Sequence, residues 1–291
     1  IYVTTTAASS MERHLYRVPL AGGAPEKLTA AAGWHGVDLS RDFDYFLDAF
    51  STATEPATTS LYRTSGEPVA VLVDNADLKA RVAAYDLPAV EFMTVPGADG
   101  TPLNAYLVKP RDFDPTREYA LLIHTYGGPG SQEVRNSWGG TERLWHHYLA
   151  ETYGVLVAGV DNRGTGGRGA AFRTATQNRL GILEAEDRIA AAQHFGAMPY
   201  VDADRMGIWG WSYGGYLSLL AMTYGDGPET FHAGMAVAPV TNWRQYDTIY
   251  TERYLSTPQK NAEGYDLGSP VTYAENLADD QDLLIVHGDA D

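Results

Sequence analysis

The segment Gly-Trp-Ser-Tyr-Gly at residues 210–214 constrains the fold most strongly, because of what flanks it. The apolar run 205–209 precedes the segment, and the helix-favouring run 215–222 follows it. A serine on so tight a turn between a strand and a helix needs small neighbours, so that adjacent chain segments can approach. The turn holds the serine clear of the sheet, at the positive end of the helix. The pattern predicts an exposed Ser212 hydroxyl.

Short apolar runs, rich in branched residues and bounded by Gly, Pro or Asp, recur through the second part of the chain. They occupy residues 119–124, 155–160, 205–209, 236–238 and 283–287. Such runs are typical of strands that are buried on both faces. The clearest helical pattern between them has one apolar face, formed by Ile182, Ala185, Ile189, Ala192 and Phe195. Strand–helix alternation of this kind predicts a parallel sheet covered by helices on both faces.

The predicted sheet decides how the serine turn is interpreted. A G-x-S-x-G pentapeptide alone occurs in ordinary glycine-rich turns, but between a buried strand and a helix it is the nucleophile turn of the α/β-hydrolase fold. We therefore assign residues 88–291 to an α/β-hydrolase domain and Ser212 to the role of nucleophile.

Residues 1–87 have a different character, with short strand patterns separated by turns and no convincing helix. A Leu-Tyr-Arg triplet occurs at residues 15–17 and again at 61–63. The interval is close to the period of about 40–50 residues that is typical of β-propeller blades. We interpret residues 1–87 as the last blade or blades of a β-propeller, most of which lies upstream.

Composition excludes several classes of function. The net charge of −16 argues against nucleic acid as a partner, because phosphates repel such a surface. The absence of cysteine removes disulfides and thiolate sites, and no metal-ligand spacing is present, so we expect no metal and no cofactor. No apolar run approaches the roughly 20 residues that cross a bilayer, and no signal peptide is visible.

A serine nucleophile needs a base and an orienting acid, which in this fold follow it in the order serine, acid, histidine. The segment His-Gly-Asp-Ala-Asp at residues 287–291 follows a predicted strand and offers Asp289 and Asp291 as acids. All eight histidines precede Asp291, and His287 is expected to shape the acid-bearing turn. We therefore expect the hydrolase domain to be truncated here and its catalytic histidine to lie further along the chain.

An oxyanion hole has two candidate donors. The backbone N–H of the residue after the nucleophile, Tyr213, is one. The other comes from the loop after an early strand, which reads His-Thr-Tyr-Gly-Gly-Pro-Gly at residues 124–130. There the Tyr126 hydroxyl is able to donate to a developing negative charge, although a packed tyrosine at a strand end is the alternative.

The glycines at residues 164–169 satisfy G-x-G-x-x-G, a pattern that also marks dinucleotide sites. Residues 161–163 intervene between strand and glycines, and no acidic ribose ligand follows a second strand. A flexible loop near the active-site edge is the better interpretation.

At this level of detail the chain resembles the prolyl oligopeptidase family of serine peptidases, and within it the dipeptidyl peptidase IV group. The matching motifs lie at residues 126–132, 160–164, 178–181, 208–216, 237–243, 246–247 and 250–254, the last reading Tyr-Thr-Glu-Arg-Tyr. The resemblance implies Ser212 as nucleophile, Asp291 as acid, and Tyr126 and Tyr213 as oxyanion donors. It also implies a proline pocket walled by Tyr213, Val240, Trp243, Tyr246 and Tyr250.

The spacing of Trp243, Tyr246 and Tyr250 at i, i+3 and i+7 predicts one face of a helix. An aromatic stripe is more often core packing. After a strand at the carboxyl edge of the sheet, however, it lines the active-site crevice, where flat rings suit pyrrolidine.

The implied function is a dipeptidyl aminopeptidase that cleaves after proline or alanine near the N-terminus of short peptides. The alternatives are a tripeptidyl, acylaminoacyl or oligopeptidase relative, an esterase of the same fold, and a non-catalytic binding module. The resemblance further implies a homodimer and favours a periplasmic or secreted location.

Overall fold

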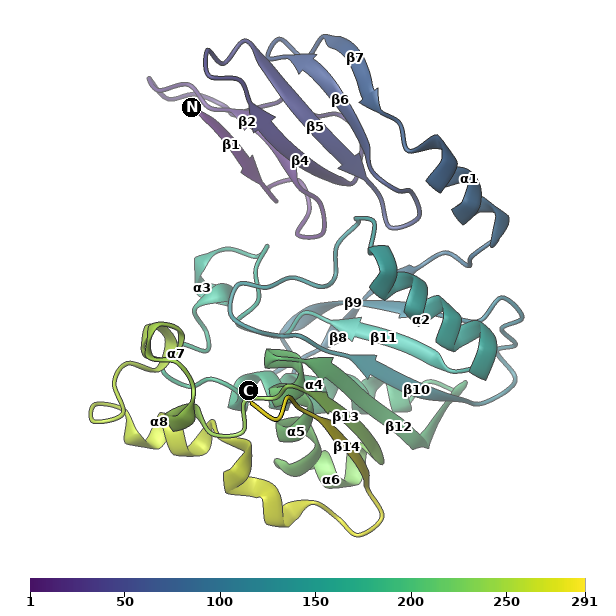
Figure 1. Ribbon diagram of the computed structural model, residues 1–291, viewed down its shortest axis with the longest axis vertical. Helices are drawn as coiled ribbons and strands as arrows, with labels where there is room; N and C mark the ends of the chain where they lie inside the picture. The colour runs from purple at the N-terminus through teal and green to yellow at the C-terminus, as the bar shows by residue number, and fades with distance from the viewer. Residues whose placement is uncertain (291) are drawn as a thin grey trace. The chain divides into compact units, whose positions relative to one another are not determined.

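The computed structural model describes residues 1–290. The chain separates into two compact units, one formed by residues 1–90 with 135–148 and the other by residues 91–134 with 149–291. Figure 1 shows antiparallel sheets in the first unit and a larger sheet with helices in the second.

The first unit contains two antiparallel sheets of consecutive strands. The smaller sheet consists of β1 (Tyr2–Thr5), β2 (His14–Arg17) and β3 (Glu26–Lys27). The larger one consists of β4 (Trp34–Leu39), β5 (Tyr45–Ser51), β6 (Thr58–Arg63) and β7 (Pro68–Val73). A four-stranded antiparallel meander is the form of a propeller blade, and both Leu-Tyr-Arg triplets lie on strands, β2 and β6.

Helix α1 (Ala76–Ala84) corrects the expectation that this part of the chain forms only strands. The Asp74 carboxylate accepts a hydrogen bond from the backbone N–H of Ala76 at 3.0 Å, at the start of the helix. Asp77 lies in the first turn and Arg81 in the last, where each charge complements the helix dipole. The helix has no buried residue, so no apolar face announces it in the sequence.

The second unit is built on a seven-stranded sheet with the order β14-β13-β12-β10-β11-β9-β8. Its strands are β8 (Glu91–Pro96), β9 (Pro102–Val108), β10 (Tyr119–His124), β11 (Leu156–Val160), β12 (Val201–Trp211), β13 (Ala233–Val237) and β14 (Asp282–Val286). The strands β10 to β14 are parallel, as predicted. Strands β8 and β9, which the sequence pattern does not predict, pair antiparallel because a short turn joins them: the Gly97 N–H donates to the Thr101 carbonyl at 2.8 Å.

Helices α4 (Ile182–Gly196), α5 (Tyr213–Thr223) and α6 (Gly227–Thr230) contact one another and the sheet (Figure 1). The predicted apolar face of α4 is confirmed, because all five of its residues are buried. The remaining elements are α2 (Gly140–Tyr153), α3 (Ala170–Arg173), the short 3₁₀ helices η1 (Trp243–Gln245) and η2 (Pro270–Asn276), α7 (Thr248–Leu255) and α8 (Ala262–Leu267). Within residues 1–290, no helix has the length and apolar character needed to cross a bilayer.

Candidate active site

Ser212 lies on a strained turn between β12 and α5. Its backbone has φ 57° and ψ −117°, a region that costs a residue with a side chain about 1–3 kcal/mol. The Ser212 N–H donates to the carbonyl of Val237 at the end of neighbouring strand β13, at 2.8 Å. This bond holds the turn against the carboxyl edge of the sheet and leaves the serine half-buried. The strained turn between strand and helix is the one that the sequence pattern predicts, whereas Ser212 is half-buried rather than exposed.

The glycines around the serine are required by close backbone approach. A Cβ atom on Gly210 would lie 2.1 Å from the Thr125 carbonyl oxygen, and one on Gly214 would lie 1.9 Å from the same atom. A Cβ on Gly215 would lie 2.6 Å from the Val237 carbonyl oxygen. Helix α5 therefore begins pressed directly against the loop that follows β10.

That loop brings Tyr126 to the serine turn. A Cβ on Gly214 would lie 3.1 Å from the Tyr126 Cα, and the Tyr126 ring centroid lies 6.2 Å from that of Tyr213. The Tyr126 side chain is 40% exposed. Partial burial, with smaller effects from Tyr246 and Tyr254, raises the pKa of Tyr126, so the hydroxyl keeps its proton as a donor. The other predicted donor, the Tyr213 N–H, is the first of α5, where N–H groups have no partner within the helix.

The predicted pocket residues lie together, although not on one helix. Trp243 is in η1, Tyr246 is extended with φ −90° and ψ 166°, and Tyr250 is in α7. The expectation of a single helix is wrong because Asp247 caps a new one: its side chain accepts the Tyr250 N–H at 2.9 Å. A polar cap in mid-segment outweighs an i, i+3, i+7 spacing.

The aromatic rings nevertheless form one cluster. Trp243, which is 1% exposed, stacks on Tyr250 with 6.0 Å between centroids and 15° between planes. Tyr246 meets the same two rings edge-on, at 5.9 and 5.7 Å. Val240 packs against this cluster, and so does Tyr213, whose ring centroid lies 5.9 Å from that of Trp243.

A buried carboxyl group that sequence reasoning missed holds the Tyr213 ring. The Tyr213 hydroxyl donates to Glu184 at 2.8 Å, and the Gly181 N–H donates to the other carboxyl oxygen at 2.9 Å. Glu184 is fully buried on α4, and this burial raises the pKa of Glu184 to about 8. The group is therefore largely protonated at neutral pH, and it fixes the Tyr213 ring within the aromatic cluster.

Replacement of Glu184 by glutamine is expected to flatten the fall in stability between about pH 5 and pH 8. In the unfolded chain the carboxyl group loses its proton near its ordinary pKa of 4.5, but in the folded protein it keeps the proton until about pH 8. The folded state therefore loses stability across this window, by up to several kcal/mol. Urea midpoints of both proteins at pH 5 and pH 8 measure it, since other titrating groups cancel in the difference. An unchanged difference between the two pH values would contradict the raised pKa.

The predicted acid, Asp291, lies outside the residues that the structure describes. The chain before it follows the expected course: β14 ends at Val286, and Nδ1 of His287 lies 3.2 Å from the carbonyl oxygen of Gly288. His287 thus contacts the acid-bearing turn.

The glycine-rich loop packs against the loop of Tyr126. The Gly130 N–H donates to the Gly164 carbonyl at 2.9 Å, and the Gly166 N–H donates to the Ser131 carbonyl at 2.7 Å. The glycines therefore allow two loops to approach at the active-site edge. Among residues 1–290 there is no group of three or more His, Asp and Glu side chains arranged to hold a metal ion.

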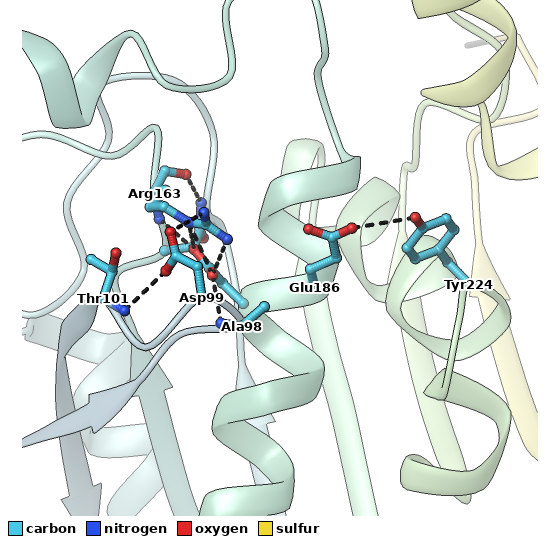
Figure 2. A network of polar contacts seen from close by, with 8 residues as sticks. Ala98, Asp99, Thr101, Arg163, Glu186 and Tyr224 are labelled. Carbon is cyan, nitrogen blue, oxygen red and sulfur yellow. Dashed lines mark hydrogen bonds and ion pairs between the residues drawn. The ribbon is translucent and has the colours of Figure 1, made fainter.

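A second buried carboxylate connects α4 with the loop after β11 and with the turn between β8 and β9. Asp187, which is fully buried on α4, binds Arg163 at 2.8 Å and accepts the Ala98 N–H at 3.1 Å. Arg163 also pairs with Asp99 at 2.7 Å, as Figure 2 shows. The same view contains a second contact, from the Tyr224 hydroxyl to Glu186 at 3.4 Å. Charged residues on a helix ordinarily face water, so the sequence holds no signal for the burial of Asp187.

Comparison with known proteins places this geometry in a family. A profile of the prolyl oligopeptidase family matches residues 141–291, and one of the dipeptidyl peptidase IV N-terminal region matches residues 1–57. The chain is 40% identical to the protein named probable dipeptidyl-aminopeptidase B of Emericella nidulans over 296 residues, covering 100% of this chain and 32% of that protein. The corresponding protein of Metarhizium robertsii is 38% identical with the same coverage. The chain thus spans about a third of the length of these relatives.

A solved structure agrees with the sequence matches. The crystal structure of Porphyromonas gingivalis dipeptidyl peptidase 4 superposes with a TM-score of 0.92 at 42% identity, covering 99% of this chain and 40% of that chain. This similarity confirms the predicted architecture of an α/β-hydrolase preceded by part of a β-propeller. The chain belongs to the prolyl oligopeptidase family.

Proposed function

We propose that this chain carries most of the active site of a serine exopeptidase of the dipeptidyl peptidase IV type. The observation that carries the proposal is Ser212 on its strained turn, beside both the Tyr126 loop and a stacked aromatic pocket. The relatives named for dipeptidyl peptidase activity support the same function. In this proposal residues 1–87 belong to the propeller and residues 88–291 to the catalytic domain.

The reaction is acyl transfer. Ser212 attacks the carbonyl carbon of the scissile peptide bond and forms the new C–O bond, while a histidine base takes its proton. In this fold the base follows the acid in chain order, and Asp291 is the proposed carboxylate that orients it. The Tyr126 hydroxyl and the Tyr213 N–H donate to the tetrahedral oxyanion. The histidine then protonates the leaving amine, and water hydrolyses the acyl-enzyme.

The pocket supports a preference for proline. Tyr246 is exposed and Tyr250 half-buried, and their rings meet at 90° to form an apolar surface, while Trp243, which is 1% exposed, stacks on Tyr250 and supports it. A pyrrolidine ring is rigid and has no N–H to satisfy, so it enters such a site without leaving a buried donor unpaired. One methylene more or less changes binding in an apolar pocket by only about 1–3 kcal/mol, so alanine is expected to be a slower substrate.

The full-length protein is expected to hydrolyse Gly-Pro p-nitroanilide fastest, Gly-Ala p-nitroanilide about 10- to 100-fold more slowly, and Gly-Leu p-nitroanilide negligibly. N-acetyl-Gly-Pro p-nitroanilide and Ala-Ala-Pro p-nitroanilide test the length preference, because a dipeptidyl peptidase requires a free amine two residues from the cleaved bond. Fast cleavage of the blocked or longer substrate would favour an oligopeptidase or tripeptidyl peptidase. Cleavage of simple esters alone would identify an esterase, and no turnover would indicate a binding module.

The resemblance also implies a homodimer, which sedimentation of the full-length protein tests. Peptides with proline or alanine in the penultimate position are the proposed substrates.

A further inference from the structure

A cluster of buried polar side chains lies next to the loop that carries Tyr126. Asn162 and Arg188 have no exposed surface, Asp161 is 1% exposed and His124 6% exposed, and the Glu133 side chain is 9% exposed. None of these residues has a part in the acyl-transfer steps described above. All belong to the second unit, at the carboxyl edge of β10 and β11 or on α4.

Two of these side chains, Glu133 and Asn162, lie against the backbone of Tyr126 and Gly127. The Tyr126 N–H lies near the Glu133 carboxylate and helps to lower the pKa of that group. The Asn162 amide donates to the Gly127 carbonyl at 3.1 Å. The chain at Gly127 has φ +69° and passes so close to Asn162 that a Cβ there would lie 2.6 Å from the Asn162 Oδ1. The hydrogen bond from Asn162 and this close approach therefore fix the backbone at Gly127, next to Tyr126.

The two side chains are themselves held by Arg188. Its guanidinium donates to Glu133 at 3.1 Å and to the Asn162 Oδ1 at 3.0 Å, so the acceptor and the amide are bridged by one rigid group. The latter bond also fixes the orientation of the amide, so that Nδ2 faces Gly127. His124 Nδ1 lies 2.9 Å from the Glu133 carboxylate on the opposite side.

The negative charge of Glu133 is stabilised by neighbouring groups. Burial alone raises the pKa of Glu133, but His124, Arg188 and the Tyr126 N–H together lower it to about 2. Asp161 anchors the same segment, because its carboxylate accepts the N–H groups of Glu133 at 2.8 Å and of Val134 at 3.2 Å. The cluster thus contains an ionised carboxylate, that of Glu133, on a backbone segment that Asp161 holds in place.

We propose that Glu133, Arg188 and Asn162 are positioning residues that set the place of the Tyr126 hydroxyl relative to Ser212. The Tyr126 side chain is partly exposed, so the orientation of its hydroxyl depends on the backbone from which it projects. An oxyanion donor has to be in place before the charge develops, and a misplacement of about 1 Å costs about 100-fold in rate. This inference rests on the proposed function, because it requires Tyr126 to act as an oxyanion donor.

A double-mutant cycle in the full-length protein tests the proposal with Gly-Pro p-nitroanilide. Glu133→Gln keeps the size of the side chain but removes the charge that holds Arg188, and is expected to lower kcat about 10- to 100-fold with KM within twofold, since the pocket is untouched. Tyr126→Phe is expected to lower kcat about 100-fold. In the Tyr126→Phe background, Glu133→Gln is expected to lower kcat less than twofold further, because the hydroxyl that it positions is gone.

A matched control separates positioning from general loss of structure. Asp48→Asn removes a buried carboxylate that pairs with His35 at 2.7 Å in the other unit, and is expected to leave kcat within twofold. If Glu133→Gln does not fold, Asn162→Asp serves instead: it is isosteric but removes the donor to Gly127, and the same non-additivity with Tyr126→Phe is expected.

The outcomes are distinct. Equal fold-losses in the presence and absence of the Tyr126 hydroxyl, or no loss from either variant, would overturn the positioning role while leaving the proposed function intact. A Tyr126→Phe protein with normal kcat would instead overturn the oxyanion assignment.

Discussion

Ser212→Ala is expected to lower kcat with Gly-Pro p-nitroanilide by at least about 10⁴-fold, measured with the full-length protein. Without the hydroxyl no acyl-enzyme forms, and only the oxyanion donors and substrate binding remain to accelerate the reaction. Alanine is close in size to serine, and the backbone bond from residue 212 to Val237 does not involve the side chain. The melting temperature is therefore expected to stay within about 2 °C of the parent value.

Ser218 provides a matched control for this change. It lies on α5 as well, is fully buried, and donates its hydroxyl to the Gly214 carbonyl at 2.8 Å within the helix. Ser218→Ala is expected to keep kcat within about threefold. Turnover by Ser212→Ala that matches the parent protein would refute the assignment of the nucleophile.

Gly214→Ala is the second change with a large expected effect, a loss of at least about 100-fold in kcat/KM together with a lower melting temperature. The new methyl group would lie 1.9 Å from the Thr125 carbonyl oxygen. This backbone atom directly follows the central strand β10, so it has little freedom to move away. Relief of this clash moves α5 and the Tyr126 loop apart, and overpacking of this kind typically costs about 1–3 kcal/mol. Both the serine and its oxyanion donor are displaced.

The matched substitution is Gly196→Ala, at the end of α4. Its methyl group would meet Met206 at 3.4 Å, an ordinary contact, and alanine favours the helix by about 1 kcal/mol. Unchanged activity and equal or higher stability are expected for this variant. Gly214→Ala with normal activity would show that the close packing of α5 on the loop does not position the site.

The fold could be predicted where local pattern and tertiary structure agree. Strand β10 has the predicted bounds, and the apolar face of α4 is buried as expected, because both patterns arise from burial in one core. Helix α1 and the antiparallel pair β8–β9 could not be predicted in the same way. The helix buries no face, and strand direction is set by the length of a turn rather than by the strand residues.

The site residues likewise fall into those that a local sequence pattern predicts and those that it does not. Ser212 and Tyr126 lie in motifs whose glycines mark places where backbone segments approach closely. The sequence alone therefore indicates the surroundings of these two residues. The Trp243–Tyr250 cluster was predicted with the wrong local structure, since the Asp247 cap interrupts the helix. Glu184 and Glu133 were missed because nothing local distinguishes a buried glutamate from a solvated one. Their burial depends on partners far away in the sequence, Tyr213 for Glu184 and Arg188 for Glu133.

The central claim is that Ser212 is the nucleophile of a site that selects proline, and covalent labelling tests it most directly. A Gly-Pro diphenyl phosphonate is expected to inactivate the full-length protein with one equivalent bound, and peptide mapping by mass spectrometry should locate the adduct on Ser212. The analogous Gly-Leu phosphonate should react at least about tenfold more slowly. A stoichiometric adduct on any other residue, or equal rates with both reagents, would contradict the account.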